Sequence, residues 1–448
     1  MGLSIQHSTL TSQHSQVAGK RLFTSLAVSL MGALALVVDS GYTIGPALLL
    51  LASVTLLWRR PVLNLQAEDK WLMAVIAGYS LLFLAQLMWE GAGSRTYDRP
   101  SRFLFAVPVL LFVFAYPPKL SWLWSGLAVG SVLTGSWAIW QKLVLGVDRA
   151  TGYTYVIQFG NISMLFGLFC LAGLGWAAVQ PNSKRWVVLL LLGAVFGVLG
   201  SLLSGTRGGW IGLPFVFLVL YRAYGNLLAV KLRLGIMAGL LALVALVYVV
   251  PQTGVQSRVH RAFTDIDLYI SGQSQTTSLG ARFEMWQGAL ILIAEKPLTG
   301  WGWEGYQIGM QALVDKGEVI QFAADHHAHN EYLDNFARRG ILGLLSLLAL
   351  YLVPLRLFAR RLTESNLELR ALATAGAILP VAFMDFGLSQ VFFGHNSGVM
   401  VYAFWLAVLW GTLRAYEKRS VGAELQPKDK SKDTKNHLPR NPRNPQKN

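Results

Sequence analysis

The stretch W-V-V-L-L-L-L-G-A-V-F-G-V-L-G-S-L-L-S, residues 186–204, decides the class of fold. It contains no charged side chain, and about 20 apolar residues are needed to cross the roughly 30 Å hydrocarbon layer of a bilayer. Similar runs recur along the 448 residues, of which 54% are hydrophobic and 14% are charged. A soluble protein carries roughly a quarter of its residues charged. The sequence therefore predicts an all-α polytopic membrane protein, because a backbone facing lipid has to satisfy its own hydrogen bonds.

We expect twelve membrane-spanning helices joined mostly by short loops. The predicted spans are 22–38, 42–58, 71–89, 102–116, 121–141, 155–178, 186–204, 210–225, 233–250, 340–358, 370–390 and 396–414. The corresponding division of the chain is an N-terminal segment (1–21), spans one to nine (22–250), a long outer loop with surface helices (251–339), spans ten to twelve (340–414) and a basic tail expected to be disordered (415–448).

The distribution of charge predicts the orientation of these spans. With the N-terminus in the cytoplasm, 25 of the 38 Lys and Arg residues fall on the inner side, and 15 of the 23 Asp and Glu residues fall on the outer side. Cytoplasmic loops of membrane proteins collect Lys and Arg. We therefore expect both termini in the cytoplasm and the 251–339 loop on the outer side of the membrane. Orientation accounts for the net charge of +15, so we expect membrane lipids and no nucleic acid as partners.

One apolar segment in the long loop tests this topology. Residues 288–294, G-A-L-I-L-I-A, are apolar but too short to cross a bilayer, and glutamates flank the surrounding stretch. Counting them as a span would invert every later segment. We predict instead an amphipathic helix over 281–295 at the outer surface, with Phe283, Trp286 and Leu290 along one side.

The most informative polar stretch is D-H-H-A-H-N-E-Y-L-D-N-F-A-R-R-G, residues 325–340. From Asn330 onward it reads as a helix, and Gly340 predicts a bend before the next span. His329 and Asn330 therefore lie at a helix start, where free N–H groups and the helix dipole favour an anion.

Two arginines lie in a setting suited to a phosphate ligand. Arg207 stands in S-G-T-R-G-G-W, a glycine-rich turn on the outer side, and Arg282 begins the 281–295 helix. Glycines let a backbone approach a ligand closely, and a guanidinium binds phosphate oxygens through a bidentate fork. With a histidine that accepts a proton nearby, the two arginines could hold a diphosphate while a hydroxyl nucleophile is deprotonated.

Together these motifs resemble the O-antigen ligase and polymerase superfamily of membrane glycosyltransferases, which is of the GT-C class. The motifs that carry the resemblance are H-N-x-Y-L (329–333) ahead of G-I-L-G-L-L (340–345), S-x-T-R-G-G-W (204–210), R-F-x-M-W (282–286) and P-L-x-G-W-G (297–302). The resemblance covers roughly 155–400. Twelve spans with one large loop between spans nine and ten are most similar to the O-antigen ligase family.

The resemblance implies transfer of a preassembled glycan from undecaprenyl diphosphate to a sugar hydroxyl of lipid A–core oligosaccharide at the periplasmic face. It implies inversion at the anomeric carbon, without metal, nucleotide or other cofactor. The family's essential histidine corresponds to His329 and its two essential arginines to Arg207 and Arg282. A family acidic residue corresponds most loosely to Asp385, in M-D-F-G-L-S-Q, where an ion pair between helix ends is an equal alternative.

Other polar residues have weaker assignments. Asn330 and His326 are candidate supports for His329, although a helix-capping or interface histidine is the plain alternative at 329. Gln158 and Asn161 begin the sixth span and either line the lipid-diphosphate groove or join helices. His260 and His395 receive no role, since a lone histidine near a helix end is most often solvated.

A metal site is disfavoured. The spacing of His326, His327 and His329 beside Asp325 does not match the H-E-x-x-H pattern of zinc sites. The single cysteine, Cys170, excludes a CxxC site and a disulfide framework.

Two alternative functions stay open from the sequence. The nearer one is a polymerase or a protein O-oligosaccharyltransferase of the same superfamily, which differs in its acceptor. The more remote one is a transporter, suggested by the span count. A transporter carries ionisable residues deep in its spans, whereas here the polar candidates gather at the outer ends.

Overall fold

The computed structural model describes residues 2–206, 208–227, 229–231, 233–235, 238, 245, 248–249 and 255–424. Helices make up all the regular secondary structure in these ranges. The bundle contains α1 (Gly2–Ala33), α2 (Gly41–Ser53), α3 (Leu56–Arg59), α4 (Ala67–Trp89), α5 (Asp98–Ala115), α6 (Leu120–Leu143), α7 (Val156–Ala178), α8 (Ser183–Ser204), α9 (Leu213–Tyr224), α15 (Glu331–Ala359), α16 (Leu367–Ser389) and α17 (Asn396–Glu424). The long loop contains α11 (Val255–Ile270), α12 (Gly280–Glu295), α13 (Trp303–Asp315) and α14 (Gln321–Ala324). Short 3₁₀ turns are η1 (Ser94–Tyr97), η2 (Gly225–Leu227) and η4 (Phe392–Gly394).

Seven helical segments of the described chain are long and apolar enough to cross a membrane. They are Gly41–Arg59, Ala67–Trp89, Val156–Ala178, Ser183–Ser204, Glu331–Ala359, Leu367–Ser389 and Asn396–Ser420. The chain is therefore an all-helical membrane protein, as predicted. The count is lower than twelve partly because α5 carries three charged residues in its first five positions and α9 has only 12 residues. The predicted span at 233–250 lies largely outside the described residues.

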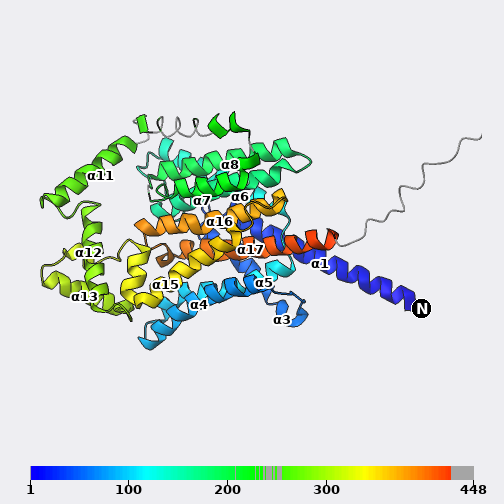
Figure 1. Ribbon diagram of the computed structural model, residues 1–448, viewed down its shortest axis with the longest axis horizontal. Helices are drawn as coiled ribbons and strands as arrows, with labels where there is room; N and C mark the ends of the chain where they lie inside the picture. Colours follow the sequence, from blue (N-terminus) through cyan, green and yellow to red (C-terminus); the bar gives the residue numbers. More distant parts are fainter. Residues whose placement is uncertain are drawn as a thin grey trace, which may run out of the picture.

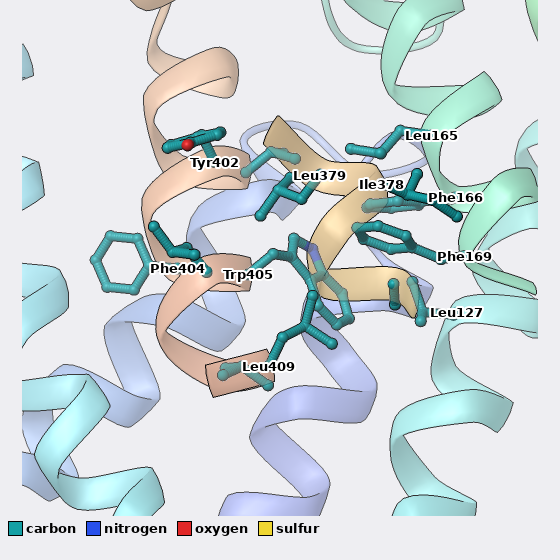
Figure 2. Close-up of a cluster of buried hydrophobic side chains, with 14 of the residues drawn as sticks. Leu127, Leu165, Phe166, Phe169, Ile378, Leu379, Tyr402, Phe404, Trp405 and Leu409 are labelled. Carbon is teal, nitrogen blue, oxygen red and sulfur yellow. The ribbon is translucent and has the colours of Figure 1, made fainter. Parts of the chain in front are cut away.

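The centre of the bundle is built by α7, α16 and α17, whose span segments are almost entirely buried. Figure 2 shows Trp405 of α17 pointing toward α16, with Phe166 and Phe169 of α7 beside it. Its ring lies 5.8 Å from that of Phe166 and 5.7 Å from that of Phe169, both in edge-on geometry, which aromatic pairs prefer. This packing fixes the positions of the helix ends that surround the candidate site.

The long loop forms a helical domain at one end of the bundle. Figure 1 shows α11, α12 and α13 together at this end, whereas the start of α1 and the end of α17 lie at the opposite end. The predicted helix is confirmed as α12, outside the seven candidate spans, and its position at the membrane surface stays a prediction. Its buried face, with Ala281, Met285, Ala289 and Leu292, packs inside the loop domain, while Leu290 is exposed.

Two predicted boundaries were wrong. The helix that contains the first span begins at Gly2 and ends at Ala33, whereas we expected a span at 22–38. The tail was expected to lose structure after 414, but α17 continues to Glu424. Contacts with the bundle explain this extension, because the Tyr416 hydroxyl donates to Pro118 O (3.1 Å) and the Lys418 ammonium to Leu63 O (2.6 Å).

The predicted bend at Gly340 is confirmed. Its φ of 63° and ψ of −162° interrupt α15, so that this helix belongs to the loop domain before the break and to the bundle after it. A break leaves backbone groups without their helical partners, which is costly when they are buried. Here residues 297–302, which we call the strap, supply new partners. The hydrogen bonds are Trp301 N–H to Ala337 O (2.8 Å), Gly302 N–H to Arg338 O (2.9 Å) and Ile341 N–H to Pro297 O (2.8 Å).

Two glycines make this junction possible. A Cβ on Gly340 would lie 2.1 Å from Leu298 O, and one on Gly300, where φ is 71°, would lie 2.4 Å from the backbone of Arg338. Both the space and the left-handed conformation therefore exclude a larger residue. The motif P-L-T-G-W-G at 297–302 thus has a structural role, since it forms the strap that bonds to the backbone at the break in α15.

We predict that Gly340→Ala lowers the free energy of unfolding by about 2 kcal/mol or more, because strain at positive φ adds to a backbone clash. The measurement is the midpoint of thermal unfolding in detergent. Gly317→Ala is the matched control, since its φ is 75° but nothing lies within 4 Å of the added Cβ. An equal loss in the two variants would contradict the strap interpretation.

Candidate active site

Residues 326–329, which contain three histidines and which we call the histidine run, lie between α14 and α15. Asn330 holds this run in place. The Asn330 side chain caps α15, because its Oδ1 accepts from the N–H groups of Tyr332 (3.0 Å) and Leu333 (3.1 Å). Its Nδ2 donates to Leu388 O at the end of α16 (3.3 Å). The predicted helix start is confirmed, and the same side chain attaches the loop domain to the bundle.

The backbone of His329 adopts an unusual conformation. Its φ is 46°, in the left-handed region that residues other than glycine rarely occupy. Its N–H donates to His327 Nδ1 at 3.1 Å, and the two rings lie 4.2 Å apart. The His329 Nδ1 atom is buried without a hydrogen-bond partner among the described residues. A buried polar atom without a partner is expected where a ligand binds.

Arg282 lies in the first turn of α12. Trp286, one turn further along α12, donates from Nε1 to Ala328 O at 2.9 Å and so holds the histidine run against this helix. The Arg282 charge acts directly on His329. Within the described residues the partly buried Arg282 side chain makes no hydrogen bond or ion pair, in contrast to Arg338, which pairs with Asp334 at 3.1 Å. Arg282 is therefore available to an anionic ligand.

Burial and neighbouring positive groups lower the pKa values of these histidines. For His329 the pKa falls to about 3, first through burial and then through His327 and Arg282. Burial also lowers the pKa of His395 to about 4. The ordinary value is about 6.5, so His329 is neutral at physiological pH and can accept a proton. Without a ligand, however, it is a weaker base than the sequence alone suggested.

Asp385 lies in the last two turns of α16. It is buried, its Oδ1 has no hydrogen-bond partner, and it makes no ion pair among the described residues. A Cβ on Gly212 would lie only 2.5 Å from the Asp385 Cβ, and one on Gly209 would lie 2.8 Å from Asn161 Oδ1. The glycine-rich turn therefore packs directly against Asp385 and Asn161.

Gln158 and Asn161 lie one turn apart in the first half of α7. Both side chains are fully buried, and all four of their polar atoms lack a hydrogen-bond partner in the described part of the chain. A buried amide without partners costs about 1–3 kcal/mol, so joining helices does not explain them. Their position beside the glycine-rich turn makes them candidates to contact a ligand.

Arg207 itself lies outside the described residues. The turn that carries it is anchored before this position, where Thr206 Oγ1 donates to Val156 O at the start of α7 (3.1 Å). After it, a Cβ on Gly208 would lie 2.0 Å from Ser389 Oγ at the end of α16. Both flanks of Arg207 thus lie at the same helix ends as Asn161 and Asp385.

His395 was given no role from the sequence, but it lies in this cluster. Its ring is 6.5 Å from that of His327 and 5.4 Å from that of Tyr155. His326 stacks on Phe322 at 4.1 Å. His395 is 66 residues from His329 along the chain, in the turn before α17, so only the packing of α16 and α17 reveals the proximity. No group of three or more His, Cys, Asp or Glu side chains in the described ranges is arranged to hold a metal ion.

Comparison with known proteins identifies the family. Residues 192–348 match the family described as O-antigen ligase. An uncharacterized protein of Haemophilus influenzae is 31% identical over 386 residues, which cover 84% of this chain and 95% of that protein. The O-antigen ligase of Escherichia coli strain K12 is 26% identical over 214 residues, covering 47% of this chain and 48% of that protein.

The chain belongs to the O-antigen ligase family. It is thus a glycosyltransferase-type membrane enzyme, with glycan and lipid-linked substrates as the general class. The matched segment contains Arg282, His329 and Asn330. The resemblance to this family that we predicted from the sequence motifs is therefore confirmed. The roles of the individual residues stay predictions.

For this family member we predict that His329 stays neutral at pH 5. Nitrogen NMR of histidine-labelled protein should show the imidazoles of His329 and His395 with neutral shifts at that pH, and His329→Gln should remove one of these two signals. Since the pKa of His329 is lower in the folded than in the unfolded chain, folding releases a proton. Its contribution to stability is therefore complete above about pH 6.5 and is lost as pH falls toward 3. A His329 signal that titrates near pH 6.5 would contradict this picture.

Proposed function

We propose that this chain is an O-antigen ligase. It transfers a preassembled glycan from undecaprenyl diphosphate to a sugar hydroxyl of lipid A–core oligosaccharide, without a metal or other cofactor. The single observation that carries the proposal is the pairing of a neutral His329, whose Nδ1 has no partner, with an Arg282 that makes no ion pair among the described residues. A proton acceptor beside a free cation suits attack by a hydroxyl on a diphosphate-linked carbon.

The proposed site is at the periplasmic face of the bacterial inner membrane. The loop domain lies opposite the start of α1 and the end of α17 (Figure 1), so cytoplasmic termini would place His329 in the periplasm. Two termini on the same side require an even number of crossings. The twelve proposed spans, which include the largely undescribed 233–250 segment, meet this requirement. The distribution of Lys and Arg supports the same orientation.

In the proposed reaction the acceptor hydroxyl attacks the anomeric carbon of the donor glycan. The new C–O bond forms on the face opposite the diphosphate while the bond from carbon to the diphosphate oxygen breaks, which inverts the anomeric configuration. His329 takes the proton of the acceptor hydroxyl, and Arg207 and Arg282 bind the departing diphosphate. Asp385, Gln158 and Asn161 line the donor side of the site, and Asn330 and His326 hold the position of His329.

The donor also adjusts the strength of the base. Arg282 is one of the groups that lower the pKa of His329. A bound diphosphate brings negative charge next to both side chains and therefore raises this pKa. We predict that geranyl diphosphate, added as a short donor mimic, raises the pKa of His329 in the NMR titration. In Arg282→Gln the same addition should produce a smaller rise, because the anion binds less tightly. No change in the wild type would contradict the assigned diphosphate site.

The enzymatic test uses purified full-length protein with a polyprenyl-diphosphate glycan and lipid A–core in the presence of a chelator. We predict that His329→Ala lowers the transfer rate by about 10²–10⁴-fold, the usual contribution of a general base. His260→Ala is the matched control, since this exposed histidine of α11 belongs to the same loop domain. Full activity of a folded His329→Ala variant would contradict the proposed mechanism.

The product distinguishes the ligase from its relatives. Glycan on lipid A–core supports a ligase, a longer lipid-linked glycan indicates a polymerase, and glycan on protein indicates an oligosaccharyltransferase. No product of any kind from the wild type would contradict a transferase.

Topology can be tested independently with cysteines. We predict that Asp325→Cys reacts with an impermeant thiol reagent in intact spheroplasts, whereas Lys184→Cys reacts only after lysis, because the two exposed positions lie on opposite sides. Cys170 is fully buried and gives little background. Labelling of Asp325→Cys only after lysis would overturn the periplasmic assignment.

A further inference from the structure

A second polar cluster extends from the histidine run toward α5. It consists of Arg99, Tyr155 and His395, which we call the Arg99 rim. The rings of Tyr155 and His395 lie 5.4 Å apart, nearly edge to face. The charge of Arg99 is close enough to act on both of them. Since the His395 ring is 6.5 Å from that of His327, the rim continues directly from the residues around His329.

The rim has an excess of positive charge. Asp98, the nearest carboxylate along the chain, is occupied by Arg102, which donates to both of its oxygens at 3.2 and 2.7 Å. The exposed Arg99 side chain makes no hydrogen bond or ion pair with the described residues. The three rim residues also lie at the starts of α5, α7 and α17, and helix starts favour anions. The Arg99 rim is therefore suited to bind an anion.

Arg99 and Arg282 act at different ends of the histidine cluster. Arg282 contributes to the electrostatics of His329, whereas Arg99 contributes to those of His395 and Arg282 does not. If the donor diphosphate occupies the Arg282 end, the Arg99 end is left for the second substrate. The exposed Tyr155 ring adds an aromatic surface of the kind that stacks on sugar rings.

We propose that the Arg99 rim binds a phosphate group on the acceptor oligosaccharide and so orients the accepting sugar toward His329. The guanidinium fork of Arg99 matches two phosphate oxygens, and the neutral His395 donates a further hydrogen bond. Tyr155 packs on the sugar that carries the phosphate. This inference rests on the proposed function, because it assigns the second substrate of the same site.

The first test is a binding measurement, which does not require turnover. Detergent-solubilised full-length protein is titrated with lipid A–core and, separately, with the same material treated with phosphatase, and binding is followed by microscale thermophoresis. We expect phosphatase treatment to weaken binding to the wild type roughly 10-fold or more, as loss of a charged hydrogen-bonded pair does. Arg99→Ala should show the same weakening with intact lipid A–core and no further loss after phosphatase treatment.

Two variants make the result specific to the rim. Arg99→Lys keeps the charge but not the fork and should weaken binding less than Arg99→Ala. Arg95→Ala is the matched control, because Arg95 is exposed in the adjoining η1 turn, and it should bind normally. In the transfer assay Arg99→Ala should raise the KM for lipid A–core about 10-fold without changing the KM for the donor.

The outcomes separate this inference from the proposed function. Transfer by the wild type, combined with equal binding of intact and phosphatase-treated lipid A–core, would overturn the rim and leave the ligase in place. Phosphate-dependent binding that requires Arg99, without any transfer, would support the rim and overturn the ligase. A higher donor KM in Arg99→Ala would place the donor here and overturn the assignment to the acceptor.

Discussion

The interruption of α15 at Gly340 is the constraint on which the arrangement of this protein depends. A continuous helix would carry residues 331–339 straight on from the bundle, and the histidine run would point away from the other helix ends. The break redirects this segment, and the 297–302 strap binds the backbone groups that the break releases. Gln86 of α4 adds a hydrogen bond to Arg338 O at 2.7 Å. The junction therefore fixes the loop domain to the bundle through main-chain contacts, whose geometry varies little.

The arrangement of the candidate site follows from this junction. Because Asn330 caps α15 and also bonds to the end of α16, it holds the neighbouring His329 at these helix ends, where the charge of Arg282 acts on it. Several helix starts meet here, and their dipoles supply positive potential without any additional side chain. Such a region is suited to substrates that carry phosphates, because fixed backbone dipoles need no rearrangement when the anion arrives.

The sequence predicted the parts of this structure that depend on local pattern. Apolar length identified the helices, the polar start of the 331–339 segment identified the cap at Asn330, and glycine identified the break at 340. It could not predict contacts that depend on packing between distant helices. Arg99 and His395 are almost 300 residues apart and resemble ordinary polar residues near helix ends, so nothing in the sequence connects them. The low pKa of His329 was missed for the same reason, since burial is a property of the folded chain.

The left-handed backbone at His329 has a consequence for the evolution and engineering of this protein. In this conformation, steric strain destabilises a residue other than glycine by roughly 1–3 kcal/mol, whereas glycine adopts it without this strain. Selection for thermal resistance alone would therefore favour glycine at position 329 and discard the imidazole. The histidine at this position therefore lowers the stability of the folded chain locally. A stabilised version of this enzyme has to gain its heat tolerance elsewhere in the chain.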